Sequence, residues 1–565
     1  MFVVFEGIDG SGKTTLSNMV FERLCARGLK AKHLRAGGQF VSTVSEAIRS
    51  LGRDARNLDM VPATEFMLYV ARDVQLIEEA LKPALKNHDV VFADRFLYTA
   101  EVIATSGRRL LAAFTAPVLK VAASGITPDL VVLMDVDPTL ARARRKAHKR
   151  AVGDVRPPSR RGLGGVGLQH RLRQGYLALA NSRPETWVVV ENDQKLDEAA
   201  ARVSDLIEHS LMHGVEPAVR RYRQQAASHT ASDSPALANT RQALERFMRW
   251  VELRAETEPR VAAYMLAGLW GEGVDTLRRA LMEHVPEAVI ASLHGLRDAV
   301  SCECRDRAKT AFAAPVARSL AGCPNTDERA RGLRLELAPV APREVLVTLA
   351  GLDDETAWEL RAQLGGREPN ALMQSLAQLS SARAWTLRQR WLDACTELMG
   401  THYDLASVAS RSVHGLGDER AFEVRETAKR AAPVAALNSL AGVGCEQSFR
   451  WRERYITRAP KPVMMTLRGS ADPRAFALRA RVAADCKEAI DSIGGLDAEQ
   501  AWSLRETYVD VWPSTVLKSL GPLADTVRGQ CLVERLLDAH AQNISLLKHA
   551  SALALGLHHA PYADD

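Results

Sequence analysis

Residues 7–14, which read Gly-Ile-Asp-Gly-Ser-Gly-Lys-Thr, have the composition and spacing of a phosphate-binding loop. They follow an apolar run at 2–6 and precede a helical pattern, the strand–loop–helix order that a P-loop requires. Glycines let backbone N–H groups approach phosphate oxygens, and the helix that follows adds its positive dipole end. The alternative is a glycine turn that binds nothing, which the flanking strand and helix disfavour. We therefore expect the nucleotide phosphates to be bound by Gly7, Gly10, Ser11, Gly12, Lys13, Thr14 and Thr15.

Within this loop, Lys13 is expected to reach the β- and γ-phosphates, and the Thr14 hydroxyl to ligate Mg²⁺. Two further apolar runs, 90–94 and 130–135, end in the acids Asp94 and Asp135. Ligands bind at the carboxyl ends of strands in parallel sheets, so an acid there is well placed to hold Mg²⁺ or its water. Either acid taken singly is equally consistent with an ion pair on the surface.

The elements that must position these residues alternate between strand and helix patterns up to about residue 212. Candidate strands cover 2–6, 89–93, 130–135 and 186–191, with helical patterns such as 64–85 and 168–180 between them. This alternation, together with the P-loop sequence, predicts an α/β P-loop domain, a parallel sheet with helices on both faces.

Four segments in this region resemble the thymidylate kinase family. They are Phe5–Thr15, Glu65–Phe96, Leu130–Pro138 and Gly167–Ala180. Their order and spacing are similar to those of the family, and the resemblance covers about the first 212 residues, a little over a third of the chain. It implies phosphoryl transfer from ATP, with Mg²⁺, to a nucleoside monophosphate (dTMP + ATP to dTDP + ADP).

The resemblance also implies roles for individual residues. Asp9 would face the acceptor and the transferred phosphoryl group, while Asp94 and Arg95 would arrange the Mg²⁺ waters and the acceptor phosphate. The implied catalytic residues are Asp9, Lys13, Arg95 and Arg144. The implied acceptor-binding residues are Arg35, Leu68, Arg72, Asp94, Arg95 and Thr99, and the implied metal ligands are Thr14 and Asp94.

This chain departs from the family pattern where the acceptor base is read. Leu68 stands at the position of a base-stacking phenylalanine, and Ala104 at that of a glutamine that reads the pyrimidine edge. The family's Arg-Glu-Pro-Gly-Gly is reduced to Arg-Ala-Gly-Gly at 35–38. A site that lacks the group that hydrogen-bonds a base forfeits discrimination. The phosphate-binding residues are therefore better preserved than the base reader, and the acceptor base stays open.

A basic segment follows the third of these strands. Residues 142–173 hold eleven lysines or arginines against one acid. Arg144 aligns with a family arginine that closes over ATP, while Arg150, Arg156, Arg160 and Arg161 lie in Gly/Pro-rich sequence typical of a mobile loop. The segment either contacts phosphate during turnover or is a solvated basic loop, which could also touch nucleic acid phosphates.

Length and composition set limits on the whole molecule. At 565 residues the chain is too long for one core, and its net charge of +6 leaves any anionic partner to a local patch. Eight cysteines without a Cys-x-x-Cys pair indicate a reducing compartment, not a zinc site or a disulfide framework. With no signal peptide and no apolar run of about 18 residues, we expect a cytoplasmic protein that does not enter a membrane.

The remainder reads as a linker at 213–240 followed by an all-α repeat array at 241–565. Similar segments recur at 355–376, 419–440, 473–493 and 499–520, each pairing an arginine with a leucine or isoleucine about fifteen residues later. The arginines, about 27 residues apart with one two-residue slip and one ten-residue insertion, are Arg278, Arg305, Arg334, Arg361, Arg388, Arg425, Arg452, Arg479 and Arg505. Such a unit holds two short helices that can bury their apolar faces only against neighbouring units. The pattern predicts an α-solenoid of helix hairpins, resembling HEAT repeats, with Trp358 and Trp502 in its core.

Two interpretations of the recurring arginine remain open. It could bridge adjacent hairpins, or form a surface ladder that binds an acidic protein or nucleic acid.

Two functions are accordingly considered. The first is a nucleoside monophosphate kinase whose array regulates it or binds a partner, with a homodimer left open. The second is a nucleotide-dependent switch or NTPase whose repeats recognise a protein or nucleic acid, for example in bacterial conflict or signalling.

Overall fold

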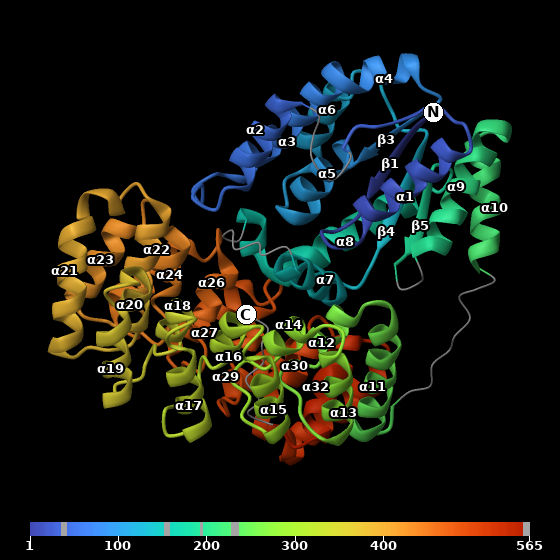
Figure 1. Ribbon diagram of the computed structural model, residues 1–565. Helices are drawn as coiled ribbons and strands as arrows, with labels where there is room; N and C mark the ends of the chain where they lie inside the picture. Colours follow the sequence, from blue (N-terminus) through green and yellow to red (C-terminus); the bar gives the residue numbers. More distant parts are fainter. Residues whose placement is uncertain (36–41, 152–158, 193–195, 228–236, 558–565) are drawn as a thin grey trace. The chain divides into compact units, whose positions relative to one another are not determined.

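The computed structural model describes residues 1–35, 42–151, 159–192, 196–227 and 237–557 (Figure 1). They form two compact units: unit 1 comprises Met1–Lys146 and Arg156–Asp233, and unit 2 comprises Ala147–Val155 and Ser234–Asp565.

The sheet of unit 1 is five-stranded and entirely parallel, in the order β2-β3-β1-β4-β5. The strands are β1 (Phe2–Glu6), β2 (Ala31–His33), β3 (Val90–Asp94), β4 (Leu130–Asp135) and β5 (Trp187–Glu191). Every residue of β1 and β3 is buried, which explains their continuous apolar sequences. Phe5 pairs with Asp94 and Glu6 with Leu133, so the carboxyl ends of three strands meet at one edge. The parallel sheet predicted from sequence is confirmed; β2 escaped prediction because it is three residues long and only partly buried.

Helices cover both faces of this sheet (Figure 1). Up to residue 227 they are α1 (Lys13–Ala26), α2 (Thr43–Arg53), α3 (Pro62–Leu76), α4 (Lys82–Asn87), α5 (Leu97–Val102), α6 (Ala112–Ala122), α7 (Pro138–Ala151), α8 (Gly165–Ser182), α9 (Leu196–His213) and α10 (Val215–Ala227), with π-helical turns η2 (Ile77–Leu81) and η3 (Ile103–Gly107) and the 3-10 turn η4 (Arg160–Gly164). Helices α1, α9 and α10 share a core with the strands, while α8 contacts β4 and β5. The helix predicted at 64–85 is α3, η2 and part of α4 in succession. Pro83 lacks the N–H that an unbroken α-helix would need, which accounts for the π-helical turn before it.

Helix α10 lies inside the stretch 213–240 for which the sequence predicts a linker. Its residues Ala218, Val219 and Tyr222 are buried in the core of unit 1, on one face of the helix. The other face is polar and charged, so apolar residues are few in this segment and their helical spacing is hard to recognise in the sequence. Unit 1 therefore continues past the predicted boundary at 212, and residues 228–236 of the predicted linker lie outside the described part of the chain.

Unit 2 is built of helix hairpins. It opens with α11 (Thr240–Thr257) and α12 (Pro259–Met265). The first helices of the following hairpins are α13 (Glu272–Met282), α15 (Ala299–Ala308), α17 (Glu328–Leu337), α19 (Glu355–Leu364), α21 (Ala382–Met399), α23 (Glu419–Ala428), α25 (Glu446–Tyr455), α27 (Pro473–Val482), α29 (Glu499–Thr507) and α31 (Val527–Ala539). The second helices are α14 (Pro286–Ser292), α16 (Ala313–Ser319), α18 (Pro342–Val347), α20 (Pro369–Ser375), α22 (Tyr403–Ser412), α24 (Pro433–Asn438), α26 (Pro460–Met465), α28 (Glu488–Asp491), α30 (Pro513–Leu520) and α32 (Ile544–Ala554), with the 3-10 turn η5 (Gly521–Asp525) before α31.

Local sequence signals set the ends of these helices. Aspartates cap many first helices; the Asp418 side chain, for example, accepts a hydrogen bond from the Ala421 N–H. Proline begins many second helices, where its missing N–H has no cost. A glycine with positive φ, such as Gly351 or Gly415 (φ 77° in both), follows most second helices.

The nine recurring arginines are at most 2% exposed. In a representative hairpin, Arg425 Nη2 donates to the Val413 carbonyl of the preceding hairpin at 2.8 Å, and its Nε donates to Ser439 Oγ of its own hairpin at 2.7 Å. Arg361 repeats this arrangement with Leu349 and Ser375. The arginines thus bridge adjacent hairpins. Because they are buried, the alternative of a surface ladder built from these nine residues is wrong.

The array closes on itself. Helix α11 packs against α32, and Arg246 Nη1 donates to the Ala541 carbonyl at 3.1 Å (Figure 1). Phe247 and Val251 of α11 and Leu546 of α32 are fully buried. A linear array would expose an apolar face at each end; here the two ends cover each other.

All eight cysteines are free thiols. Within the ranges that the structure describes, no helix combines the length and the apolar character needed to cross a membrane.

Candidate active site

The loop between β1 and α1 has the backbone of a phosphate cradle. Gly7, Gly10 and Gly12 have φ values of 136°, 91° and 88°. A Cβ atom on Gly7 would lie 2.4 Å from the Met134 carbonyl oxygen, and one on Gly10 2.4 Å from that of Ala141. Only glycine fits at these positions, so the backbone N–H groups stay open to an anion at the start of α1.

Lys13 lies across this loop. Its Nζ donates to the Ile8 carbonyl at 2.7 Å and to Ser11 Oγ at 3.3 Å. Burial, together with the nearby Arg95, lowers the pKa of Lys13 to about 7, although Asp94 and Asp9 oppose the shift. The Asn192 amide, from the end of β5, donates to the Ser11 carbonyl and secures the loop from its other side. Of the predicted phosphate-binding residues, Thr15 is exposed at the surface of α1.

Asp94 lies at the end of β3, within reach of the loop. The Thr14 hydroxyl donates to its Oδ2 at 2.5 Å, and its Oδ1 is buried without a hydrogen-bond partner in the described part of the chain. Burial acts to raise the pKa of Asp94, but Arg35, Lys13 and Arg95 outweigh it and hold this pKa below its ordinary value. The two residues predicted to hold a metal are thus adjacent, and the carboxylate is charged.

Arg95 is held in a strained conformation by a dense network. Its φ of 82° is in the left-handed region, which costs a non-glycine residue about 1–2 kcal/mol. Its Nη2 bonds Asp9 Oδ1 at 2.5 Å, and its Nη1 donates to the Gly7 carbonyl at 3.1 Å and to Thr99 Oγ1 at 3.2 Å. Arg95, Asp9 and the glycine loop therefore form one rigid group.

Glu6 and Tyr176 support Arg95 and were missed by the sequence reasoning. Glu6 is fully buried at the end of β1; its Oε2 accepts from the Thr99 hydroxyl at 2.8 Å and lies 3.9 Å from Arg95 Nη1. Burial raises the pKa of Glu6, with Arg95 opposing the shift. Tyr176 Oη, from α8, lies 3.3 Å from Arg95 Nη1. The sequence signal for Glu6 is an acid at the end of an otherwise apolar strand. Thr99 links Arg95 to Glu6, because its hydroxyl accepts from Arg95 and donates to Glu6.

Two further arginines lie on this side of the loop, one beside Asp94 and one paired with Asp73. Arg35 Nη1 donates to the Asp94 carbonyl at 3.3 Å and lies 3.7 Å from its Oδ2. Arg72, buried on α3, pairs with Asp73 at 2.5 Å and lies over the Tyr69 ring. Burial raises the pKa of Asp73, and Arg72, Arg35 and Arg95 all oppose that shift, so the three guanidinium groups act on one region. Residues 36–41, which include the rest of the Arg-Ala-Gly-Gly segment, lie outside the described residues.

The positions expected to read a base carry apolar groups. Leu68 is half-buried on α3, and its Cδ1 lies 3.9 Å from where a Cβ on Gly52 of α2 would be. Ala104 is 1% exposed inside η3. Neither can donate or accept a side-chain hydrogen bond from a base.

The basic segment is described in part. Arg144 is half-buried on α7, and the Cγ of the adjacent Arg145 lies 2.9 Å from where a Cβ on Gly10 would be, so Arg145 lies beside the loop. Arg160 is buried, with its Nη1 2.9 Å from Glu65 Oε2 of α3. Arg156 lies outside the described residues, as do the side chains of Arg150 and Arg161.

Asp135, the second acid at a strand end, is engaged by an arginine. Arg173 of α8 binds both of its carboxylate oxygens, at 2.7 and 2.6 Å. Of the two acids considered for a metal, only Asp94 therefore keeps a buried oxygen without a partner among the described residues.

These features define a class of protein. A glycine cradle with a buried lysine binds one phosphate chain, and a neighbouring group of arginines around Asp94 can neutralise a second phosphate. Together with the parallel sheet, this is the site of a P-loop phosphotransferase.

Comparisons with known proteins agree with this class. The family model for thymidylate kinase matches residues 5–203. The thymidylate kinase of Geobacter sulfurreducens is 34% identical over 209 residues, covering 36% of this chain and 95% of the relative. That of Prosthecochloris aestuarii is 30% identical over 209 residues, covering 37% and 92%. A crystal structure of thymidylate kinase from Ehrlichia chaffeensis is similar at 20% identity and a TM-score of 0.28, over 37% of this chain and 98% of that one.

The chain belongs to the thymidylate kinase family through its N-terminal region, and that region is a nucleoside monophosphate kinase. The match ends at residue 203, before the helical array begins.

Proposed function

We propose that unit 1 transfers the γ-phosphoryl group of ATP to the phosphate of a nucleoside monophosphate, with thymidylate the first candidate acceptor. An acceptor phosphate oxygen bonds to the γ-phosphorus, and the bond from that phosphorus to the β–γ bridging oxygen breaks, so that ADP leaves. Such reactions depend mainly on positioning and on neutralising charge.

The observation that carries this proposal is a group of buried arginines beside the glycine loop: Arg35 and Arg95 act on Asp94, and Arg72 is close enough to act on Arg35. A nucleotide hydrolase or sensor needs the loop but has no use for a second set of buried cations. Lys13 would bind the donor phosphates, Arg95 would lie between donor and acceptor, and Asp9 would hold Arg95 in place. Arg145, beside Gly10, and its neighbour Arg144 would neutralise charge on the donor side.

Mg²⁺ fits the donor set of this site. Thr14 and Asp94 would hold it, because Asp94 offers a charged carboxylate with one buried oxygen that has no partner in the described residues. Mg²⁺ commonly takes most of its ligands from phosphate and water, so one or two protein oxygens are enough to hold it. When bound, Mg²⁺ would neutralise charge on the phosphates of ATP.

The acceptor base would be bound mainly by apolar contact. Because Leu68 and Ala104 offer no side-chain hydrogen bond, we expect weaker discrimination between bases than a site with a polar reader achieves. We therefore expect thymidylate and other pyrimidine monophosphates to have similar values of kcat/KM.

For unit 2 we propose a regulatory or partner-binding role within a cytoplasmic enzyme. Its closed array holds no P-loop sequence and adds a large surface to a kinase that needs none for its chemistry. The alternative, a nucleotide-dependent switch whose repeats recognise a protein or nucleic acid, is favoured by the altered base reader and by the large appended array.

A homodimer of unit 1 is also proposed. The neighbouring helices α3 and α6 expose Met67 (48%), Phe114 (44%) and Val121 (79%), with Leu111 at 76% just before α6, an apolar surface suited to a second copy.

The test is an assay of the full chain with ATP, Mg²⁺ and a panel of deoxy- and ribonucleoside monophosphates. We expect diphosphate formation with at least one pyrimidine acceptor, and its loss in Lys13→Ala, with the folded state checked by circular dichroism. ATP consumption that is independent of every acceptor would instead establish the switch.

A further inference from the structure

Aromatic rings in the array are sandwiched between two arginines. In six hairpins the residue three positions before the buried arginine is aromatic, and the buried guanidinium lies over its ring. In four of these a second, exposed arginine from the next hairpin covers the opposite face. The exposed arginines and their rings are Arg383 over Trp358 (4.3 Å), Arg420 over Trp385 (4.2 Å), Arg474 over Phe449 (4.1 Å) and Arg528 over Trp502 (4.6 Å).

One hairpin keeps both arginines but has lost the ring. Cys302 stands three residues before the buried Arg305, the position of the aromatic residue elsewhere. Arg329 precedes the next buried arginine, Arg334, by five residues, just as Arg383 precedes Arg388. The inner and outer arginines of the sandwich are therefore present around a side chain that is much smaller than a ring.

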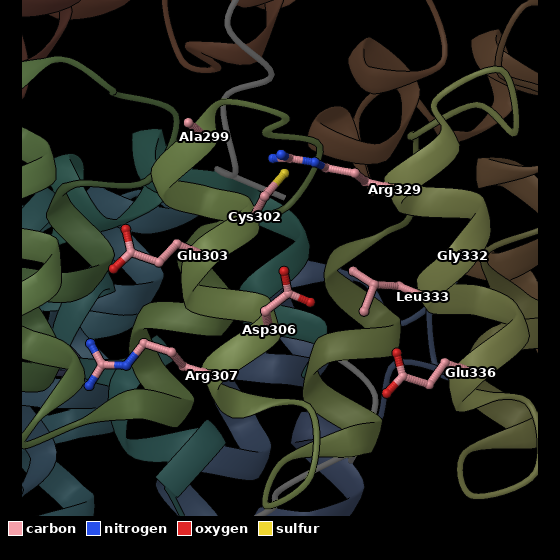
Figure 2. A pocket seen from close by; sticks show the side chains of 9 residues that line it. All are labelled: Ala299, Cys302, Glu303, Asp306, Arg307, Arg329, Gly332, Leu333 and Glu336. Atoms are coloured by element: carbon pink, nitrogen blue, oxygen red, sulfur yellow. The ribbon is translucent and has the colours of Figure 1, made fainter.

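A cavity adjoins this position, with Cys302 and Arg329 in its wall but not the buried Arg305. A volume of about 610 Å³ opens between α15 and α17, lined by Cys302, Arg329, Leu333 and neighbouring residues (Figure 2). Figure 2 shows Arg329 extending from α17 toward α15, on the side where Cys302 lies. In the described part of the chain the Arg329 guanidinium makes no ion pair or hydrogen bond. The volume is within the range of ligand pockets and exceeds what one ring would fill.

The charges around the cavity restrict its occupant. Glu303, Asp306 and Glu336 line it, against only two basic residues, Arg307 and Arg329. Arg307 is paired with Glu283, and all three carboxylates have cation partners outside the cavity, Glu303 with Arg279, and Asp306 and Glu336 with Lys309. These exposed ion pairs are weak, and the three carboxylates outnumber the two cations in the cavity wall, so a basic group is better matched there than a phosphate group.

We propose that this cavity binds an aromatic side chain of a partner peptide, stacked against Arg329 and flanked by basic residues. The aromatic ring takes the place that tryptophan or phenylalanine has in the other hairpins, and the cationic flanks face Glu303, Asp306 and Glu336. The inference is independent of phosphoryl transfer and assigns to the array a specific recognition site.

The experiment titrates the full chain with three capped tripeptides. Isothermal titration calorimetry and saturation-transfer NMR measure their binding. The probes are acetyl-Lys-Trp-Lys-amide, acetyl-Lys-Leu-Lys-amide and acetyl-Glu-Trp-Glu-amide. We expect the first peptide to bind, and the other two to bind at least tenfold more weakly.

Two variants locate the binding. Cys302→Trp fills the cavity from within, so it should abolish binding and raise the midpoint of thermal unfolding by a few degrees. Arg329→Ala changes an exposed residue that the fold does not need, and should weaken binding roughly tenfold through loss of the cation–π contact.

A matched control uses a complete sandwich. Adding Trp502→Cys to the Cys302→Trp chain empties the equivalent place between Arg505 and Arg528, and should restore binding of the aromatic peptide. Equal binding of the leucine peptide, tighter binding of the acidic peptide, or full binding by Cys302→Trp would overturn the proposal. So would the absence of binding by the natural chain.

Discussion

Both units bury arginines almost completely, but with different partners. In unit 1 the partners of Arg95 and Arg72 include the carboxylates of Asp9, in the glycine loop, and Asp73, on α3. In unit 2 the nine recurring arginines donate mostly to backbone carbonyls and hydroxyls at helix ends. The pKa values of these arginines reflect the difference in partners. Burial lowers the pKa of Arg425 to about 10, whereas the acids around Arg95 raise its pKa despite its burial.

Burial of a charge therefore does not identify a functional site by itself. In the array the guanidinium replaces backbone hydrogen bonds that the short helices cannot make, because the last carbonyls of a helix have no partner within it. In the kinase unit the cations are balanced by acids that a phosphate can replace or join. The buried arginines of the array therefore stabilise the fold, whereas those of the kinase unit place positive charge where we propose that phosphate binds.

The largest expected effect comes from removing a cation in unit 1. Arg95→Met should lower the rate of phosphoryl transfer roughly 10³-fold, because the charge on the transferred group is no longer neutralised. Steady-state kinetics with the best acceptor measures this loss. Melting curves of the same variant show whether the fold persists; activity within tenfold of the natural chain would remove Arg95 from the proposed role.

The same substitution in the array should act on stability instead. Arg425→Met leaves the Val413, Leu416 and Ser439 carbonyls without their donor and should lower the free energy of unfolding by about 3 kcal/mol. Urea denaturation followed by circular dichroism measures it, while activity below the transition should stay within twofold. If Arg425→Met costs activity but no stability, the contrast between the two units fails.

Lys13 should make nucleotide binding depend on pH. Its pKa is about 7 without nucleotide, and phosphate oxygens favour the charged amine, so binding raises this pKa. Above pH 7 binding must therefore take up a proton, and the affinity for ATP should fall about tenfold between pH 7 and 8.5. Calorimetry in buffers of different ionisation enthalpy measures the uptake. Lys13→Arg, charged throughout this range, is the control; an identical pH profile in both proteins would contradict the prediction.

The sequence predicted those features that depend on local pattern. The glycine loop, Asp94 and the four longer strands could be found because their residue types and order are specific. The 27-residue interval of the arginines likewise indicates the hairpins, because one interval is the length of one repeat. The support of Arg95 by Glu6 and Tyr176 could not be predicted in this way, because it joins residues 89 and 81 positions apart through the sheet. The contact between α11 and α32 closes the array. It depends on the rotation of each hairpin relative to the next, added over all hairpins, and the sequence of a single repeat does not give this sum.

The smallest effect tests the geometry of the repeat itself. After α20, Gln378 takes the place of the turn glycine, with φ of 65°, and its N–H donates to the His414 carbonyl at 2.9 Å. A left-handed conformation costs a residue with a side chain about 1 kcal/mol, and glycine avoids this cost. Glycine also makes the unfolded chain more flexible, which offsets part of the gain in stability. Gln378→Gly should therefore raise the free energy of unfolding by about 0.5 kcal/mol.

The matched control for this prediction is Gly442→Ala, at the same turn of another hairpin. Gly442 has φ of 76° and no atom within 4 Å of an added Cβ, so the substitution adds conformational cost without a clash. It should lower the free energy of unfolding by about 1 kcal/mol. Denaturation midpoints of the two variants should thus move in opposite directions. Movement in the same direction would mean that contacts of the Gln378 side chain, and not the turn conformation, decide stability at this position.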